Sequence, residues 1–225
     1  MHDVLPDGCM DLIWSDGALV VAGPDTGSHP ARREPGGIAA GLRFAPGALP
    51  GLLGVPAAAL RDQRVPLAEL HPQLARRAEC RLGADRPGGP RTATDLRSGL
   101  VAVALVLPGD GADHAAPRVA ARIGRGAGVR ATADDLGCTT RTLHRRCLDS
   151  FGYGPAMLRR ILRFRRATAL LHAGTALAEV AAAAGYADQP HLSREVRRFA
   201  GVTPGQLASG ENRSTPVPSG SWTTA

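Results

Sequence analysis

Lysine is absent from this chain of 225 residues, so arginine supplies all 27 of its basic side chains. Cysteine is scarce, and the four that occur show neither a CxxC pair nor the Cys/His spacing of a zinc site: Cys9, Cys80, Cys138 and Cys147. The spacing therefore predicts no bound metal. Cys138 and Cys147 stand where apolar residues would serve, and we expect both to be small buried hydrophobic residues.

Long hydrophobic runs are missing too. The longest runs, such as residues 101–107, are too short to span a bilayer. Residues 1–7 lack the basic-then-apolar pattern of a secretion signal. We therefore expect a cytoplasmic protein with no membrane partner. A Ser-His-Asp order, a Walker loop and paired catalytic carboxylates are also absent, and the Gly-rich residues 124–128 follow a predicted helix, not a strand. The sequence thus predicts neither an enzyme active site nor a cofactor.

Charge is distributed unevenly along the chain. Residues 1–115 contain 11 Arg and 13 Asp or Glu, whereas residues 116–225 contain 16 Arg and 7 Asp or Glu. The first part therefore has a net charge of −2 and the second +9, which together give the +7 of the whole chain. A basic half beside a nearly neutral one indicates a polyanion-binding domain joined to a part with another role.

The basic half contains the same unit twice. Three residue pairs keep one offset of 49 positions: Leu143 and Leu192, Gly152 and Gly201, Pro155 and Pro204. Each copy reads as a short apolar helix, a turn at Gly137 or Gly185, and a second helix with polar residues on its outer face. This order is typical of a helix-turn-helix, whose second helix enters the major groove of DNA. Two such units in register are a much more specific signal than one.

From residue 117 onward the periodicity predicts helices at residues 118–125, 129–136, 139–151, 155–173, 176–184 and 189–200. The helix over residues 155–173 is the longest, with Pro155 suited to its first turn and Gly174 to its end. Its predicted apolar face comprises Leu158, Ile161, Leu162, Ala169, Leu170 and Leu171. Arginine surrounds this face, and we expect the face to hold both units on one connecting helix.

A helix that reads DNA needs apolar residues on its inner face and hydrogen-bond donors on its outer face. The predicted inward residues are Leu143 and Cys147 in the first unit, and Leu192, Val196 and Phe199 in the second. The predicted DNA-binding residues are Thr139, Thr140, Arg141, His144 and Arg145 in the first unit, and Gln189, His191, Ser193, Arg194, Arg197 and Arg198 in the second. Double-stranded operator DNA is the expected partner.

The first half reads as strand and turn, followed by helix. Apolar runs at residues 10–14 and 18–22, on either side of Ser15, Asp16 and Gly17, predict a β-hairpin. Residues 38–44 predict another strand, and residues 49–53 and 56–60 two short helices. Three strands bury little apolar surface, so we expect this segment to be incomplete as an independent domain. Helix is predicted from about residue 67 to residue 107, with a break at residues 83–90.

These patterns divide the chain into five parts. They are a β-rich region at residues 1–70, a helical connecting region at 71–107, a linker rich in Gly, Asp and Pro at 108–116, a DNA-binding domain at 117–208 and a disordered tail at 209–225. The predicted fold class is α+β. A β-rich partial N-terminal domain precedes an all-α domain of two helix-turn-helix subdomains joined by a long helix.

Residues 117–208 resemble the DNA-binding domain of AraC-type bacterial transcription regulators. The similarity is carried by LRRILRFRRATALLHAG at 158–174, EVAAAAGY at 179–186 and ADQPHLSREVRRFAGVTP at 187–204. It implies two subdomains that read successive major-groove segments on one face of DNA, with RNA polymerase as a further candidate partner. The first unit departs from the family pattern, because Thr132 stands where Val180 stands in the second unit and Cys147 replaces a large apolar residue. We therefore expect looser packing in the first unit.

Three stretches of the first half resemble the N-terminal domain of one branch of these regulators: VLPDGCMDLIW at 4–14, AGPDT at 22–26 and GLRFAPGALPGLLGVPAAAL at 41–60. This resemblance implies a β-rich, cupin-like sensing module whose small-molecule effector is unassigned. Relatives have more chain before the LPDG segment. Either the start lies further upstream or the sensing fold is truncated.

The main prediction is a sequence-specific transcription regulator and not an enzyme. One alternative is a DNA-repair-type regulator in which Cys9 accepts an alkyl group, but that chemistry resembles a zinc site with several clustered cysteines, and none cluster in this sequence. A second alternative is a non-specific architectural DNA-binding protein. It predicts no preferred site beyond the general attraction to phosphates.

Overall fold

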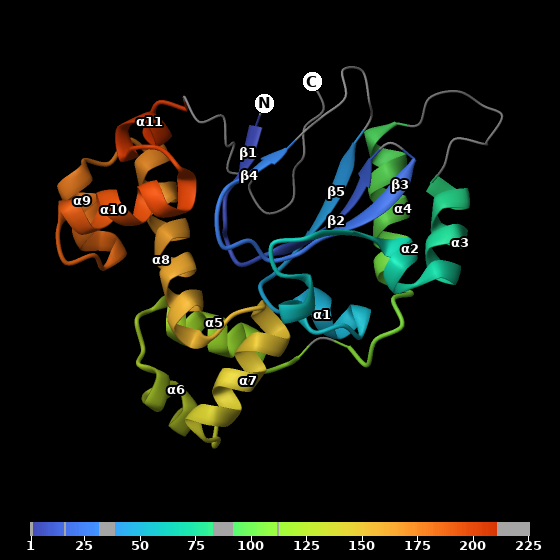
Figure 1. The fold of residues 1–225 in the computed structure, drawn as a ribbon, viewed down its shortest axis with the longest axis horizontal. Helices are drawn as coiled ribbons and strands as arrows, with labels where there is room; N and C mark the ends of the chain where they lie inside the picture. The colour runs from blue at the N-terminus through green and yellow to red at the C-terminus, as the bar shows by residue number, and fades with distance from the viewer. Residues whose placement is uncertain (1, 16, 32–38, 83–91, 112, 211–225) are drawn as a thin grey trace.

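The structure is a computed structural model that describes residues 2–15, 17–31, 39–82, 92–111 and 113–210. A sheet with helices beside it is followed along the chain by a region of helices alone, which confirms the predicted α+β class (Figure 1). The predicted tail beyond residue 210, the first residue of the strand predicted at 38–44 and the break predicted at 83–90 lie outside the described residues.

The sheet is built around the predicted hairpin. β2 (Met10–Ser15) and β3 (Ala18–Ala22) pair antiparallel, with Trp14 opposite Leu19. β5 (Ala40–Phe44) pairs with β2 and β6 (Arg64–Pro66) pairs with β3, which gives the order β5-β2-β3-β6. β1 (His2–Val4) and β4 (His29–Ala31) form a separate antiparallel pair. The hairpin is confirmed, whereas β1, β4 and β6 were not predicted.

Helices complete the core of this sheet. Two short ones, α1 (Ala48–Leu53) and the 3-10 helix η1 (Ala57–Leu60), follow β5 where they were predicted. α2 (Leu67–Leu70) and α3 (Pro72–Leu82) contact β3, and α4 (Ala93–Ala104) contacts β2 and β5. The shared core contains Leu12, Leu19 and Val21 from the strands and Leu67, Ala78, Leu82, Leu96 and Leu100 from the helices. The helices thus supply the apolar surface that the strands alone lack.

The helices of the second half agree with the prediction to within two residues at each end. They are α5 (Ala116–Gly124), α6 (Val129–Asp135), α7 (Thr140–Phe151), α8 (Pro155–His172), α9 (Leu177–Ala184) and α10 (Gln189–Ala200), followed by the short α11 (Pro204–Ala208). α5, α6 and α7 lie at one end of α8, and α9, α10 and α11 at the other (Figure 1). Across the described residues, no helix is both long enough and apolar enough to cross a membrane.

The apolar face predicted for α8 was partly wrong. Leu158, Ile161 and Leu162 are buried, but Ala169 is exposed. Phe164, which was not included, is fully buried and its ring lies 5.1 Å from that of Phe199. The physical reason is that α8 contacts α5 and α7 at one end and α9, α10 and α11 at the other. Two packing surfaces on different sides of one helix do not follow a single stripe.

The sequence repeat is reproduced in the helix ends. Thr139 and Asp188, which are 49 positions apart, each begin a recognition helix with a side-chain oxygen that accepts a backbone N–H three residues later. Gly137 and Gly185 have φ angles of 61° and 80°, which confirms the predicted left-handed turn before each recognition helix. α7 and α10 are therefore equivalent elements of two copies of one unit.

Candidate nucleic-acid interface

The outer face of α7 presents the first set of predicted DNA-binding residues. The exposed side chains are Thr139, Thr140, Arg141, His144 and Arg145. Leu143 and Cys147 lie on the opposite face and are buried, as predicted. The hydroxyl oxygen of Thr139 accepts the backbone N–H of Thr142 at 3.1 Å, so this residue begins the helix as well as facing solvent.

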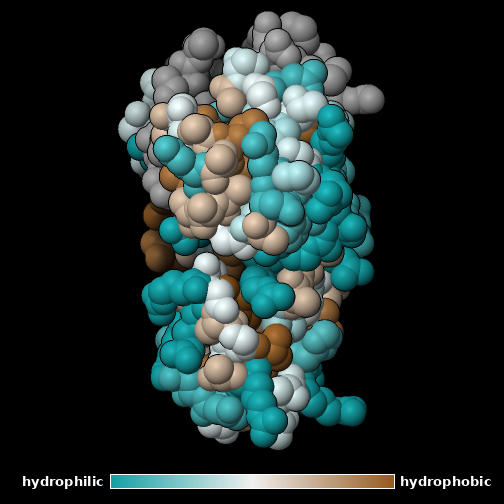
Figure 2. Space-filling view, turned by 90° about the vertical axis from the view of Figure 1, so that its left-hand side faces the viewer, coloured by the Kyte–Doolittle hydropathy of each residue, from teal (hydrophilic) through white to brown (hydrophobic). Residues whose placement is uncertain are grey.

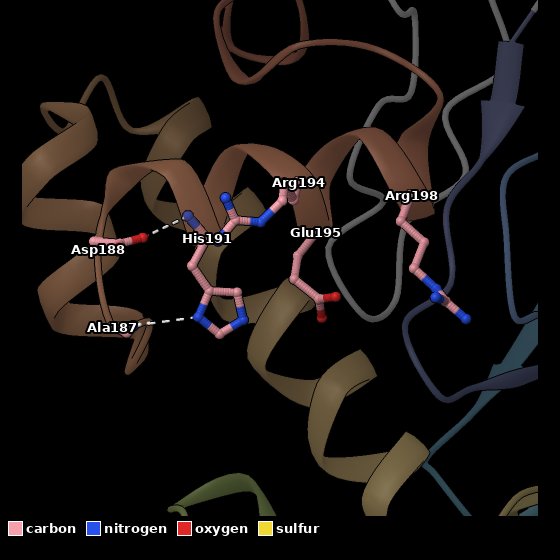
Figure 3. Close-up of a pocket in the computed structure, with 6 residues that line it drawn as sticks. All are labelled: Ala187, Asp188, His191, Arg194, Glu195 and Arg198. Atoms are coloured by element: carbon pink, nitrogen blue, oxygen red, sulfur yellow. Dashed lines mark hydrogen bonds between the residues drawn. The ribbon is translucent and has the colours of Figure 1, made fainter.

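The outer face of α10 presents the second set. Gln189, Arg194, Arg197 and Arg198 are exposed, and His191 and Ser193 are half-buried. His191 Nδ1 accepts the backbone N–H of Ala187 at 3.4 Å, which leaves its Nε2–H as an outward donor. An open pocket runs along this face (Figure 3), and its lining residues are Ala187, Asp188, His191, Arg194, Glu195 and Arg198. Hydrogen-bond donors therefore gather on the side of α10 away from its core.

An ion-pair network that sequence reasoning missed ties α10 to α8. Arg160 donates to both carboxylate oxygens of Glu195, from Nη2 at 2.6 Å and from Nε at 3.1 Å. Nη2 of Arg163 lies 3.6 Å from Glu195 Oε2, and its guanidinium sits 4.4 Å from the ring centre of Tyr186. Arg163 also donates to the carbonyl of Gly185 at 3.3 Å. Because Glu195 is buried, the network fixes how α10 is rotated on α8.

A comparison of the two copies of the repeat singles out Glu195, because an acidic residue stands where the first copy has a basic one. Arg146 stands 49 positions before Glu195 and is exposed, whereas Glu195 is the only acidic residue of α10 and is buried. Burial works to raise the pKa of the Glu195 carboxyl, but the hydrogen bond and charge of Arg160, together with Arg163, outweigh burial and place this pKa below its ordinary value of 4.5. The carboxylate therefore stays ionised at neutral pH and holds both arginines.

The arginines divide into paired and open groups. Arg118 and Arg122 form salt bridges with Asp135, and Arg160 and Arg163 with Glu195. Within the described part of the chain, no arginine of α7 or α10 forms a salt bridge. The view from the side of α9 and α10 shows two lobes with a waist between them and a mostly hydrophilic surface (Figure 2). The recognition helices thus keep cationic side chains available for phosphates and base edges.

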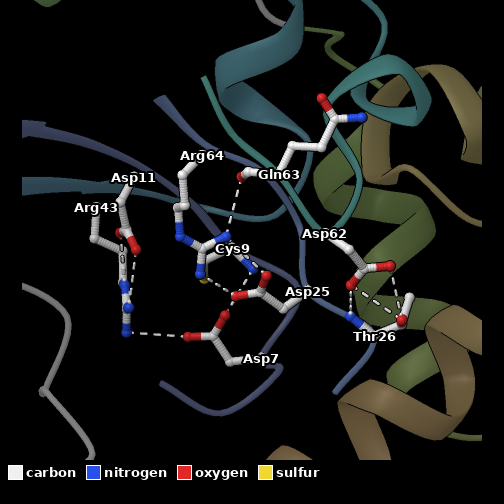
Figure 4. Close-up of polar contacts among 9 residues, drawn as sticks. All are labelled: Asp7, Cys9, Asp11, Asp25, Thr26, Arg43, Asp62, Gln63 and Arg64. Atoms are coloured by element: carbon white, nitrogen blue, oxygen red, sulfur yellow. Dashed lines mark hydrogen bonds and ion pairs between the residues drawn. The ribbon is translucent and has the colours of Figure 1, made fainter. Parts of the chain in front are cut away.

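A second polar cluster lies in the N-terminal region around Cys9 (Figure 4). Arg43 donates to Asp11 at 2.9 and 3.1 Å and forms a salt bridge of 3.0 Å with Asp7. The backbone N–H of Cys9 donates to Asp7 at 2.8 Å. The guanidinium of Arg43 is therefore paired within the protein with the carboxylates of Asp7 and Asp11, and all three side chains are mostly buried.

The thiol of Cys9 is poorly suited to nucleophilic chemistry. Burial, reinforced by the charge of Asp7, raises the pKa of Cys9 to about 12, so the reactive thiolate is scarce at neutral pH. Among the residues that the structure describes, no three His, Cys, Asp or Glu side chains are grouped so as to hold a metal ion. The raised pKa of Cys9 is unfavourable for a role as an alkyl acceptor.

Comparisons with known proteins match both halves of the chain. Residues 132–209 match a family model described as a helix-turn-helix domain, and residues 1–66 match one described as a domain of unknown function (DUF6597). No curated protein matches the chain. Among solved structures, ToxT from Vibrio cholerae matches with 11% sequence identity over 92% of each chain and a TM-score of 0.45. The helix-turn-helix model spans α7 and α10 and so includes every predicted DNA-binding residue.

Replacing Glu195 by Gln should weaken the attachment of α10 to α8. We expect the free energy of unfolding at neutral pH to fall by about 1.5–3 kcal/mol, since charge-assisted hydrogen bonds to Arg160 are lost. The folded pKa of Glu195 lies below the unfolded value of 4.5, so its stabilisation is complete above that value and is lost as the pH falls through the folded pKa. Urea unfolding at several pH values should show that the free energies of unfolding of the original chain and of Glu195→Gln become equal in acid.

The matched control is Arg146→Gln, because Arg146 occupies the equivalent exposed position of α7. It should change the free energy of unfolding by less than about 0.5 kcal/mol. Equal losses for Glu195→Gln and Arg146→Gln, or a difference that is unchanged in acid, would contradict the role of the ion pair.

Cys9 should resist alkylation in the folded protein. At neutral pH we expect iodoacetamide to label the exposed Cys80 at least about tenfold faster than Cys9, because only a thiolate reacts and that of Cys9 is suppressed by burial. Mass spectrometry of digested protein would give both rates, and unfolding in urea should bring them together. Labelling of Cys9 as fast as Cys80 would revive the alkyl-acceptor alternative.

Proposed function

We propose that residues 132–209, which match a helix-turn-helix family model, are an AraC-type DNA-binding domain, and that the chain is a sequence-specific transcription regulator that reads two successive major-groove segments of operator DNA. The observation that carries this proposal is the pair of equivalent recognition helices. Arg145 on α7 and Arg194 on α10 are 49 positions apart, exposed, and opposite buried leucines. A guanidinium at this place can bind a guanine edge with two parallel hydrogen bonds.

The proposed contacts fall into two kinds. Arg145 and Arg194, with Thr140, Gln189 and His191 near the helix starts, are assigned to base edges because the first turns of a recognition helix enter the groove most deeply. The remaining predicted residues are assigned to phosphates or to either role: Thr139, Arg141, His144, Ser193, Arg197 and Arg198. Phosphate contacts hold the register, and base contacts choose the sequence.

α8 is proposed to act as a spacer of fixed length. It holds 18 residues, and at about 1.5 Å per residue it spans roughly 27 Å. One turn of B-DNA is about 34 Å long. A helix of this length with one unit at each end can set α7 and α10 into neighbouring major-groove segments on the same face of DNA.

The arrangement of the buried clusters supports separate roles for the two halves of the chain in this proposal. One buried cluster joins the sheet to α1 through α4, and a separate buried cluster joins α5 through α11. We assign DNA binding to the second cluster and a sensing role to the first, with the boundary in the predicted linker at 108–116. A small-molecule effector and RNA polymerase are the further partners that such a regulator would use.

Arg194→Ala tests the reading of a base edge. Against an operator selected from random duplexes, we expect a loss of roughly 1–3 kcal/mol and relaxed preference at one or two positions of one half-site. Dissociation constants measured for the selected site and for a scrambled duplex would separate sequence-specific affinity from affinity for any DNA. The control is Arg166→Ala, an exposed arginine of α8 that should weaken both duplexes equally or not at all. An equal loss on both duplexes for Arg194→Ala would contradict its assignment and favour the architectural alternative.

The spacer role of α8 predicts a periodic response to half-site spacing. Inserting about five base pairs turns the second half-site to the opposite face of DNA, so affinity should fall sharply. Inserting about ten restores the face but lengthens the span, so affinity should stay well below that of the natural spacing. Gel-shift titrations with the full chain measure all three duplexes. Near-equal binding to the three would mean that the units move independently and would reject the spacer.

A further inference from the structure

The last residue of α7 and the turn after it are buried beneath the N-terminal region. We name residues 151–153 the docking turn. Phe151 and Tyr153 are each only 2% exposed, and a methyl group placed on Gly152 would lie 2.6 Å from Pro24 Cγ. Gly152 also has a φ angle of 81° and accepts a hydrogen bond from Arg61 Nη1 at 3.4 Å. Both the backbone and the side chains of this turn are therefore in close contact with the first half of the chain.

The N-terminal side of the contact is equally tight. A methyl group on Gly47 would lie 2.9 Å from the ring of Phe151 and 2.6 Å from the side chain of Ala116. A methyl group on Gly8 would lie 3.5 Å from the hydroxyl of Tyr153. Gly8, Pro24 and Gly47 come one each from the stretches 4–14, 22–26 and 41–60 that carry the N-terminal resemblance. All three stretches therefore converge on the docking turn.

The linker and α8 add polar contacts that hold this arrangement. Asp113 accepts from the hydroxyl of Ser150 at 3.0 Å, next to the docking turn. The backbone N–H of Gly109 donates to the carbonyl of Leu52 in α1 at 2.8 Å. Arg165 of α8 donates to the carbonyl of Asp7 at 3.3 Å. The linker is thus attached to both halves, so the first unit has a fixed orientation relative to the sheet.

The second unit has no aromatic pair at the equivalent positions. At the positions of Phe151 and Tyr153 it carries Ala200 and Val202. A methyl group on Gly201 would meet only the hydroxyl of Ser28, at 3.9 Å. The aromatic pair is therefore particular to the copy that contacts the N-terminal region, while the second unit is held to α8 through Glu195.

The contact leaves the proposed DNA-reading face open. Thr140, Arg141 and Arg145 are exposed although the docking turn at the other end of α7 is buried. Contacts of η1 and α1 with α7 therefore support the helix from behind its reading face. A contact of this kind can orient α7 without competing with DNA.

We infer that the N-terminal region positions the first helix-turn-helix unit for DNA through the docking turn, so that binding of the first half-site depends on this contact and binding of the second does not. This inference rests on the proposed function. Phe151 and Tyr153 are then positioning residues. A change in the N-terminal region would reach α7, but not α10, through the contact of the docking turn with Gly8, Pro24 and Gly47.

The test compares two glycine variants of the full chain. Gly47 and Gly17 have φ angles of 81° and 82°, but a methyl group on Gly17 would meet nothing within 4 Å. Gly47→Ala and Gly17→Ala therefore bring similar backbone strain, and only the first pushes on Phe151. Arg145→Ala and Arg194→Ala identify which half-site each helix protects in a hydroxyl-radical footprint. We expect Gly47→Ala to weaken binding to the α7 half-site about tenfold, which corresponds to about 1.4 kcal/mol. Its binding to the α10 half-site should not change, and Gly17→Ala should bind both half-sites like the original chain.

Two further variants change the docking turn itself. Phe151→Ala combined with Tyr153→Val installs the residues of the second copy and should reproduce the loss at the α7 half-site. Tyr153→Phe should bind like the original chain, because the Tyr153 hydroxyl has no hydrogen-bond partner in the described structure and the ring is retained. Hydrogen exchange should show faster exchange at residues 45–60 while α5, α6 and α7 stay protected. Such protection separates mispositioning from unfolding of the unit.

The outcomes distinguish the inference from the proposed function. One outcome is a variant that shows faster hydrogen exchange at residues 45–60 and still protects both half-sites fully in the footprint. That result would overturn the positioning role and leave the proposed function intact. Equal weakening of both half-sites by Gly47→Ala would also overturn it, since that pattern indicates a general loss of stability. An original chain that selects no site from random duplexes would instead overturn the proposed function.

Discussion

The rest of the C-terminal half depends on the packing of α8 against two units at once. Leu158, Ile161 and Leu162 are buried in the first part of this helix, and Phe164 and Leu171 further along. The same helix contacts α5 and α7 at one end and α9, α10 and α11 at the other. Few of its turns are left to solvent, so neither unit can rotate on α8 without exposing buried side chains. The geometry of both recognition helices therefore follows from one element.

This constraint also determines what the arginines do. With no lysine in the chain, every permanently charged basic side chain is an arginine, whose planar, forked guanidinium suits two parallel hydrogen bonds to a carboxylate or to a base edge. On α8, Arg160 and Arg163 are engaged by Glu195, which is itself buried against the helix. Asp135 engages two arginines of α5 in the same way. Asp135 and Glu195 thus pair with arginines of α5 and α8, whereas the arginines of the recognition helices form no salt bridge within the described residues.

Local patterns were predictable from the sequence, and contacts between distant segments were not. The β2–β3 hairpin and the helices from α5 to α10 follow from periodicity, turn residues and caps within short windows. β6 pairs with β3 over about forty residues, and no local pattern encodes such a register. The burial of Glu195 could not be predicted from its own helix, because it depends on Arg160, which lies on α8. Nine of the eleven predicted reading residues are exposed, His191 and Ser193 are half-buried, and the contact of all of them with DNA stays a prediction.

The two copies of the repeat stabilise the same motif by different means. Thr132 occupies the place of Val180, yet it is fully buried, and its hydroxyl donates to the carbonyl of Gly128 at 2.9 Å. A satisfied hydroxyl removes most of the cost of a polar atom in that core. The second unit fills its core with the contact between Phe164 and Phe199. In the first unit Ser150 stands at the position of Phe199, and the neighbouring Phe151 contacts the N-terminal region. The smaller residues of the first unit are thus matched by burial against the sheet domain, which makes that unit the natural place for the two halves of the chain to communicate.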